Sequence, residues 1–258
     1  MLHLISKAIV GSKTGRYWLN KLSNHEGFEP LFDLAESRAE TGLRRLRRGG
    51  YAPDVIVDVG AHRGAWTRMA MSPFPDSRFV MIEAQPDMEA ELARVRSAAP
   101  ARISYAISLV GPKTKESVEF FLADTGSSIY YENTAFSRSS ITLPMETLDS
   151  VLDAQAATGS CFLKLDVQGA ELDVLAGAHK TLERTDAILT EVSLVEYNLG
   201  APRIADVIAH FRELDFLASD IWDLRRIGAT LAQADFLFVR RGSALASQAA
   251  DAVRAYGR

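Results

Sequence analysis

The chain reads VIVDVGAHRG from Val55 to Gly64, and this stretch determines the expected fold. Its first half is dominated by β-branched residues, and the residues that follow recur at helical spacing. The segment therefore predicts a buried strand, Val55–Val59, that leads through a tight turn into a helix. Gly60 allows the turn and the close approach of a ligand to the backbone, and Gly64 lets the helix begin against the sheet.

Short apolar runs alternate with helical stretches in the rest of the chain from Asp54 onward. The expected strands are 55–59, 78–83, 103–109, 117–122, 162–166, 187–193, 216–218 and 236–239, and helices are expected near 65–70, 87–97, 147–156, 171–184 and 202–214. This order predicts an α/β fold with a mostly parallel sheet that is covered by helices on both faces. Residues 133–143 lack periodicity, which is typical either of a lid or of a plain surface connection.

Three regions follow from the same pattern. Residues 1–50 contain no convincing strand and are predicted to be an N-terminal helical extension that ends at Gly49-Gly50. Residues 51–242 form the expected α/β domain, and residues 243–258 are an alanine-rich tail whose composition is compatible with a loose helix. The arginines before Gly49 favour a solvated helix end, because cations stabilise a helix C-terminus, over an anion site.

Composition and charge give no reason to expect a nucleic-acid-binding protein, a disulfide-stabilised protein or a membrane-spanning protein. The net charge of −4 gives no general reason to expect nucleic acid. The single cysteine, Cys161, cannot form an internal disulfide, which is compatible with a cytoplasmic protein. No stretch approaches the ~20 apolar residues of a membrane span. Residues 1–22 mix basic and apolar side chains, so they predict either a weak membrane-surface helix or, preferably, a helix packed on the domain or on a second copy of the chain.

A nucleoside site is predicted where the first two strands end. Open parallel sheets bind ligands beyond the carboxyl ends of their strands. Glu83 closes the second expected strand, 23 positions after Gly60. An acid at that position can accept hydrogen bonds from both hydroxyls of a ribose. The glycine turn and the acid together indicate a nucleoside-containing ligand.

The turn favours one nucleoside over another. A dinucleotide fingerprint requires glycines spaced G-x-G-x-x-G to accommodate a pyrophosphate, and this turn has His62 between Gly60 and Gly64. It also contains Asp58, whose carboxylate is unfavourable beside pyrophosphate but suits an ammonium group. The methionine portion of S-adenosylmethionine carries both an ammonium and a carboxylate. The sequence therefore favours S-adenosylmethionine as the cofactor.

The sequence resembles the FkbM-type methyltransferases, a branch of the class I S-adenosylmethionine-dependent family. The resemblance spans about 54–241 and is carried by blocks that occur in order: residues 57–64, 81–84, 127–129 and 147–149, and most specifically KLDVQGAE at 164–171, continuing through 174–178. It implies a Rossmann-like, seven-stranded sheet with an antiparallel last strand, for which Phe236–Val239 is the expected strand.

The resemblance also implies the roles of individual residues. Gly60 with its neighbours Ala61 and His62 would hold the methionine end, and Glu83 the ribose. The adenine would lie beside Ala84 and be lined by the strand end Ala106, Ile107 and Ser108, with Asp166 near the sulfonium. His62 and Ala84 depart from the asparagine and proline common at those positions, but backbone contacts remain available to both.

Several side chains are candidates for the chemistry of an alcohol acceptor, which needs a base to remove its proton. Asp166, at a strand end, is the first candidate, with orientation of the donor as its alternative role. Glu191 lies inside an apolar strand, where a carboxylate requires a partner, and is a second catalytic or substrate-binding candidate. A structural role for His62 is favoured over proton transfer, and Glu171 is expected to pair with Lys164. Asp166 and Glu191 could alternatively share a divalent ion with a substrate oxygen, since hard cations prefer carboxylates. No part of the sequence resembles a His/Cys zinc cluster.

These patterns predict an S-adenosylmethionine-dependent methyltransferase. The resemblance implies O-methylation of a hydroxyl on a sugar, glycan precursor or secondary metabolite, so the expected partner is a small-molecule or glycan acceptor. Two alternatives are a nicotinamide-dependent oxidoreductase, against which the missing central glycine counts, and a non-catalytic nucleoside-binding module of the same fold.

Overall fold

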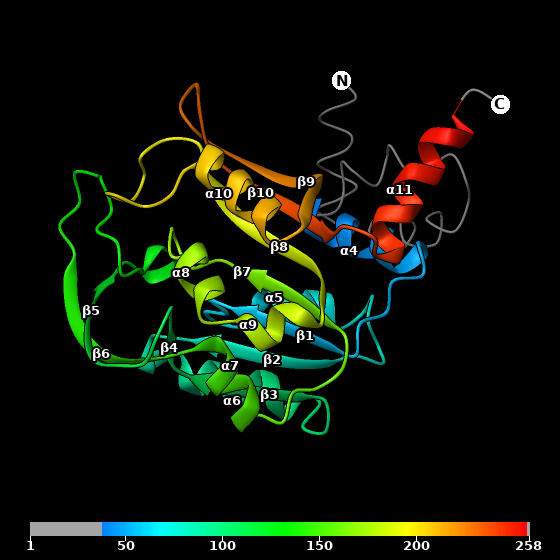
Figure 1. Cartoon of the computed structure of the whole chain (residues 1–258). Helices are drawn as coiled ribbons and strands as arrows, with labels where there is room; N and C mark the ends of the chain where they lie inside the picture. Colours follow the sequence, from blue (N-terminus) through cyan, green and yellow to red (C-terminus); the bar gives the residue numbers. More distant parts are fainter. Residues whose placement is uncertain (1–37, 257–258) are drawn as a thin grey trace, which may run out of the picture.

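The computed structural model describes residues 38–256, and within them the strands form a seven-stranded sheet in the order β3-β2-β1-β7-β8-β10-β9 (Figure 1). Its strands are β1 (Val55–Val59), β2 (Arg78–Glu83), β3 (Ile103–Ile107), β7 (Cys161–Leu165), β8 (Thr185–Ser193), β9 (Phe216–Ile227) and β10 (Thr230–Arg240). β10 runs antiparallel to both of its neighbours, whereas β1, β2, β3, β7 and β8 pair in parallel. This is the predicted sheet, with Phe236–Val239 in the antiparallel strand.

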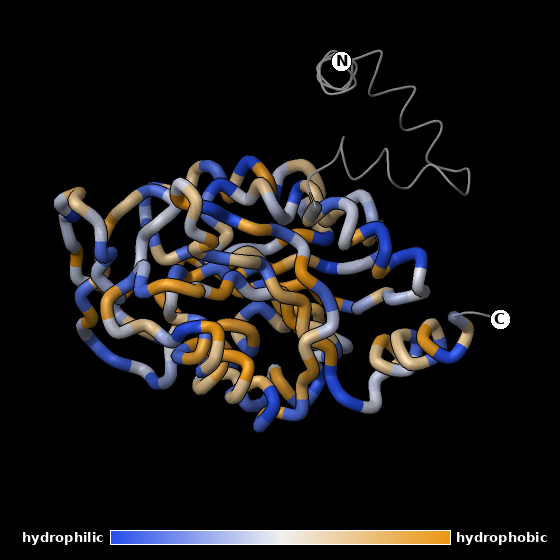
Figure 2. Tube along the Cα trace, turned by 90° about the horizontal axis from the view of Figure 1, so that it is seen from above, coloured by the Kyte–Doolittle hydropathy of each residue, from blue (hydrophilic) through white to orange (hydrophobic). Residues whose placement is uncertain are grey.

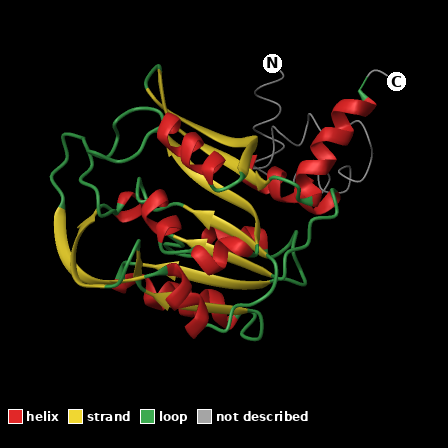
Figure 3. Cartoon of the chain, in the orientation of Figure 1, coloured by secondary structure: helices red, strands yellow, loops and turns green. Residues whose placement is uncertain are grey.

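Helices cover both faces of the sheet (Figure 3). One face is packed by α7 (Leu148–Ala154), α8 (Glu171–Ala176), α9 (His179–Glu183) and α10 (Ile204–Glu213). The other is packed by α4 (Arg38–Arg48), α5 (Ala65–Ala70), α6 (Glu89–Ser97) and α11 (Ala244–Ala255). Val55, Val57 and Val59 join the first core and Ile56 joins the second, because successive strand residues point to opposite faces. Figure 2 shows the resulting concentration of hydrophobic residues inside the molecule.

A second, three-stranded sheet in the described part of the chain consists of β4 (Leu109–Val110), β6 (Ser139–Glu146) and β5 (Lys115–Leu122) in that order. Two sequence predictions are wrong here. The expected strand 103–109 is interrupted at Ser108, where the chain passes from the large sheet to the small one. The aperiodic stretch 133–143 contains the start of β6, which is mostly exposed or half-buried and so lacks an apolar signal.

Other element boundaries also differ from expectation. The predicted helix 171–184 is divided at Gly177, where an added Cβ would lie 2.2 Å from the carbonyl oxygen of Gly111. The last two strands are much longer than predicted, because β9 is largely solvent-exposed and carries many polar residues. There are also two short 3₁₀ turns in the described chain, η1 (Pro86–Met88) and η2 (Asp124–Gly126), and η2 lines the cavity described below.

The structure describes the N-terminal extension only from residue 38 onward. Its helix α4 stops at Arg48, directly before Gly49-Gly50, where the sequence predicted the end. Leu43 and Leu46 pack α4 into the same core as Trp222 of β9. The expectations for residues 1–22 lie outside the described residues. Among helices of the described chain, none has the length and apolarity needed to cross a membrane.

Candidate functional site

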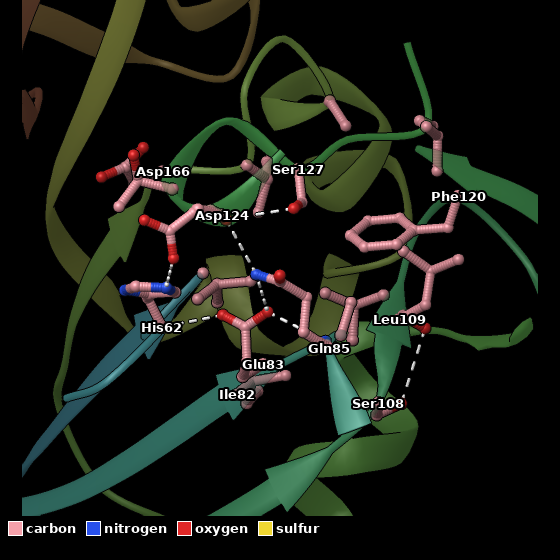
Figure 4. Close-up of a pocket in the computed structure, with 18 residues that line it drawn as sticks. His62, Ile82, Glu83, Gln85, Ser108, Leu109, Phe120, Asp124, Ser127 and Asp166 are labelled. Carbon is pink, nitrogen blue, oxygen red and sulfur yellow. Dashed lines mark hydrogen bonds and ion pairs between the residues drawn. The ribbon is translucent and has the colours of Figure 1, made fainter. Parts of the chain in front are cut away.

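A cavity of about 670 Å³, including its open mouth, lies at the carboxyl ends of β1, β2 and β7. The strand ends form its floor, and residues of the small sheet and of η2 form its other walls (Figure 4). The lining combines apolar side chains with a few polar ones: Ile82, Leu109, Val110, Phe120 and Ile129, and Glu83, Ser108 and Ser127. This composition is typical of a small-molecule site.

Glu83 is the buried acid of this cavity, with 5% of its surface exposed. The backbone N–H of His62 donates to its Oε2 at 2.7 Å, and the N–H of Gln85 donates to its Oε1 at 2.9 Å. These bonds fix the carboxylate between the two strand ends, and Figure 4 shows it facing the cavity. Nε2 of Gln85 also donates to Oε1 at 3.3 Å. A carboxylate has about four acceptor positions, so Oε2, which accepts only the N–H of His62 among the described residues, keeps capacity for a ligand.

The turn after β1 depends on its two glycines. Gly60 has φ 75°, and an added Cβ would lie 1.9 Å from the carbonyl oxygen of Asp166. Gly64 has φ 67°, and its Cβ would lie 3.0 Å from Sδ of Met81 in β2, so a side chain there would keep the helix from the sheet. Gly64, predicted to be a cofactor-binding residue, does not itself line the cavity. Gly60 and His62 line the cavity, whereas Ala61 is buried behind them.

The predicted role of Asp58 as a residue that contacts the ligand is wrong. Its side chain is fully buried under the turn and does not line the cavity, so the predicted direct contact with a ligand ammonium is not available to it. Its Oδ2 accepts a hydrogen bond from Oγ1 of Thr67 at 2.7 Å, and its Oδ1 lies 3.0 Å from Nζ of Lys164. Asp166, which follows β7, does line the cavity, and its side chain is 39% exposed.

The buried ammonium group of Lys164 contacts both Asp58 and Asp166. Its Nζ also lies 3.4 Å from Oδ2 of Asp166 and donates to the carbonyl of Gly60 at 3.3 Å. Burial alone would lower the pKa of Lys164, but Asp58 and Asp166 raise it above its usual value. The predicted pairing of Lys164 with Glu171 is not formed, because Glu171 accepts the N–H groups of Val167 and Gly169.

The far end of the cavity is lined by only some of the residues predicted to lie beside the adenine. Ser108 and Ala84 line the cavity, whereas Ala106 and Ile107 lie earlier in the chain and do not. The sequence prediction missed the wall residues that the small sheet and η2 supply: Leu109, Val110, Phe120, Asp124 and Thr125. No periodicity identified them, although the block 127–129 of the family resemblance lies next to them.

Asp124 of η2 closes one side of the cavity. Its Oδ1 lies 2.9 Å from Nε2 of His62 and 3.4 Å from a guanidinium nitrogen of Arg63. Its carbonyl accepts hydrogen bonds from the side chains of Gln85 and Ser127 at 3.0 Å each (Figure 4). His62 is therefore held through both backbone and ring, which agrees with the structural role favoured for it.

Comparison with known families identifies the chain. Residues 58–218, more than half of its length, match the model of the methyltransferase FkbM domain. The chain belongs to the FkbM methyltransferase family. It is therefore an S-adenosylmethionine-dependent methyltransferase, and the nicotinamide-dependent alternative is set aside.

Comparisons with individual proteins add distant similarities. No curated protein matches this FkbM methyltransferase in sequence. The crystal structure of the N-terminal domain of EvdMO1 in the presence of SAH and D-fucose is 9% identical, with 80% of this chain and 84% of that chain covered and a TM-score of 0.48. Magnesium protoporphyrin IX methyltransferase (ChlM) from Synechocystis PCC 6803 with bound SAM is 9% identical, with 92% of this chain and 96% of that chain covered and a TM-score of 0.44. A longer EvdMO1 structure is 12% identical, with 81% of this chain covered and a TM-score of 0.45. Only 42% of that longer chain is covered, so this chain spans less than half of its length.

A second cavity of the FkbM methyltransferase, about 550 Å³ with its open mouth, adjoins the first at Asp166. Glu191 lines it and has the partners that its position required, since Nε2 of Gln168 and of Gln233 donate to its Oε1 at 2.9 and 2.6 Å. Burial, and then the charge of Asp166, raise the pKa of Glu191 well above its usual value.

Gln168 is a site residue that the sequence prediction did not single out. The same side-chain amide donates to Asp166 at 2.9 Å and to Glu191 at 2.9 Å. Its backbone φ of 55° is strained for a residue other than glycine, and such strain is often retained at functional sites. Its position within the KLDVQGAE block is the signal that marks it. Among the described residues, no group of three or more His, Cys, Asp or Glu side chains is arranged to hold a metal ion.

Proposed function

We propose that this methyltransferase transfers the methyl group of S-adenosylmethionine to a hydroxyl oxygen of a sugar, glycan precursor or secondary metabolite. The observation that carries the proposal is the position of Asp166 at the junction of two cavities. One contains Gly60 and Glu83, and the other contains Glu191. A base must face both the donor and the acceptor, and Asp166 is placed to do so. The family resemblance supports oxygen as the methylated atom.

The residues of the first cavity fit the methyl donor. Glu83 would accept the ribose hydroxyls, and Leu109 and Phe120 belong to an apolar wall suited to the adenine. The backbone of Gly60 and His62 would hold the amino-acid end, with Asp166 as the acid within reach of its ammonium. When bound, S-adenosylmethionine supplies an electrophilic methyl group on a cationic sulfonium.

The two candidate bases differ in their surroundings. Glu191 is held by two amide donors, Nε2 of Gln168 and of Gln233, and burial raises its pKa above the usual value. Asp166 lies beside the Lys164 ammonium and opens to both cavities. We assign Asp166 as the base and Glu191, through their shared contact with Gln168, as the group that orients it. Holding the reacting groups in line supplies the rest of the catalysis.

The donor assignment is tested by replacing Glu83 with Ala and titrating S-adenosylhomocysteine calorimetrically. Losing hydrogen bonds to a charged group costs about 1.5–3 kcal/mol each, so the affinity should fall by at least about tenfold. The exposed Glu183 of α9 supplies the control, because Glu183→Ala removes the same group far along the chain from the turn. An unchanged affinity of the Glu83 variant would refute the ribose assignment, and no saturable binding by the wild type would remove the donor site.

The base assignment is tested by Asp166→Asn in a methyl-transfer assay with radiolabelled S-adenosylmethionine. A positioned base contributes roughly 10²–10⁴-fold, so turnover at saturating S-adenosylmethionine should fall by that factor. S-adenosylhomocysteine should still bind saturably, although more weakly, because the contact of Asp166 with the ammonium is altered. Mass fragmentation of the product should place the label in a methyl ether. Full activity of Asp166→Asn contradicts the assignment, and donor binding without turnover on any hydroxyl acceptor indicates the non-catalytic alternative.

A further inference from the structure

The second cavity is formed where the β9–β10 hairpin extends past the ends of β7 and β8. Resting on the proposed function, we infer that this cavity is the acceptor site, and that Asp235 of β10 binds hydroxyl groups of an acceptor that is polyhydroxylated and carries no anionic group. The acceptor must meet the methyl group, and this cavity is the one that shares Asp166 with the donor cavity.

The strand register places carboxylates side by side in the cavity. Asp235 is paired directly with Glu191 of β8 on one side and with Asp223 of β9 on the other. Asp166 follows the β7 residue that is paired with Thr190, so it extends the same row. Like charges directly opposite each other destabilise a sheet, which makes this row unfavourable for stability alone.

Asp235 lacks a partner that its neighbours have. Among the described residues, none lies within hydrogen-bond or ion-pair distance of the Asp235 carboxylate, whereas Glu191 and Asp166 each accept an amide of Gln168. Burial, and then the charge of Asp166, raise the pKa of Asp235 to about 6, so the group is ionised above neutral pH. The half-buried Asp235 carboxylate thus lines the cavity without a donor from the described residues, and hydroxyl groups of a bound acceptor would supply donors.

The charge of the cavity selects the chemistry of the acceptor. Arg225 brings a positive charge to the lining, and its Nη1 donates to Oε1 of Gln233 at 3.5 Å. Nε2 of the same Gln233 side chain donates to Glu191. The carboxyl groups of Asp166, Asp223 and Asp235 outnumber this guanidinium within the described lining. Phosphate or carboxylate groups are therefore repelled, whereas the hydroxyls of a neutral sugar find acceptors and an added ammonium is tolerated.

The probes are methyl glycosides of neutral hexoses and a 6-deoxyhexose, the matching 2-amino sugars and the matching uronates. Saturation-transfer NMR measures their binding to the full-length protein saturated with S-adenosylhomocysteine. We expect the neutral and amino glycosides to bind and the uronates not to bind. Binding of uronates above the neutral sugars, or no binding by any neutral glycoside, overturns the inference.

The variant Asp235→Asn identifies the residue. It should weaken neutral-glycoside binding by about tenfold, since it removes charged hydrogen bonds. It should leave S-adenosylhomocysteine affinity unchanged and maintain or raise the melting temperature, because it relieves the row of like charges. The control Asp251→Asn, on the exposed helix α11, changes the net charge equally and should alter none of these.

The readouts separate the failure of this inference from failure of the proposed function. Asp235→Asn with unchanged glycoside binding, or with a lowered melting temperature as its main effect, gives Asp235 a structural role and overturns the inference. Loss of S-adenosylhomocysteine binding by the wild type, or methylation at an atom other than oxygen, refutes the proposed function instead.

Discussion

The carboxyl group of Glu171 is buried at the start of α8, where it accepts two backbone N–H groups. Burial raises its pKa from 4.5 to about 7, although these hydrogen bonds act in the opposite direction. A folded-state pKa above the unfolded one stabilises the protein fully below pH ~4.5, and this contribution is lost as the pH rises through about 7. The corresponding free energy is at most about 3 kcal/mol.

Glu171→Gln should remove that dependence while keeping an acceptor for the two N–H groups. Urea unfolding at pH 5 and pH 8 should show a smaller loss of stability for the variant than for the wild type. Glu183→Gln, exposed on α9, should behave as the wild type does. An identical pH dependence of the Glu171 variant and the wild type would contradict the raised pKa.

The positions of single site residues could be predicted from the sequence where they depend only on the fold. Gly60, Glu83 and Asp166 follow or close strands, so their meeting at one sheet edge follows from the parallel topology. Asp58 was misplaced, because the sequence shows neither that its side chain points into the sheet nor that Lys164, 106 positions away, neutralises it. The unpartnered Asp235 carries no motif, and its relation to Asp166 depends on the register of a hairpin.

At the level of secondary-structure elements, a buried ion pair links the neighbouring strands β1 and β7. Asp58 of β1 and Lys164 of β7 are paired in register, and both side chains are almost inaccessible. Lys164→Met should destabilise the protein by about 3–5 kcal/mol, because it leaves a buried charge uncompensated.

The double variant Asp58→Asn with Lys164→Met should recover much of this loss, since neither charge then remains buried. Chemical denaturation of the four proteins in the cycle gives the coupling energy. Additive effects of the two substitutions would show that the pair does not act as a unit.

Elements were predicted well where strands are buried on both faces, as in β1, β2, β7 and β8, since their apolar runs leave one interpretation. The half-exposed strands β6 and β9 were missed or shortened. Their formation depends on pairing with distant strands, and local composition does not record that pairing.

Ligand binding should stabilise the whole molecule if the first cavity holds the donor. S-adenosylhomocysteine at about 100 times its Kd adds about 2.7 kcal/mol to the free energy of unfolding. For a chain of this size the melting temperature should rise by roughly 5–10 °C. Glu83→Ala should show a much smaller rise at the same ligand concentration, and an equal rise in both proteins would place the ligand elsewhere.

The architecture as a whole followed from the order of strands and helices, because parallel sheets with helical connections admit few topologies. The small sheet did not follow, although it supplies part of the cavity wall. Its strands are short, partly polar and separated by an irregular connection, so only tertiary contacts define it.

Ser108 alone separates β3 from β4, so two sheets share one continuous segment of the backbone. Inserting or deleting one residue at that point would turn the side chains of β4 to the opposite face and remove Leu109 from its core. The hairpin tip at Gly228 has open space around it and bears no such constraint. Among descendants of this gene, changes in length should accumulate at the tip and be purged from the junction.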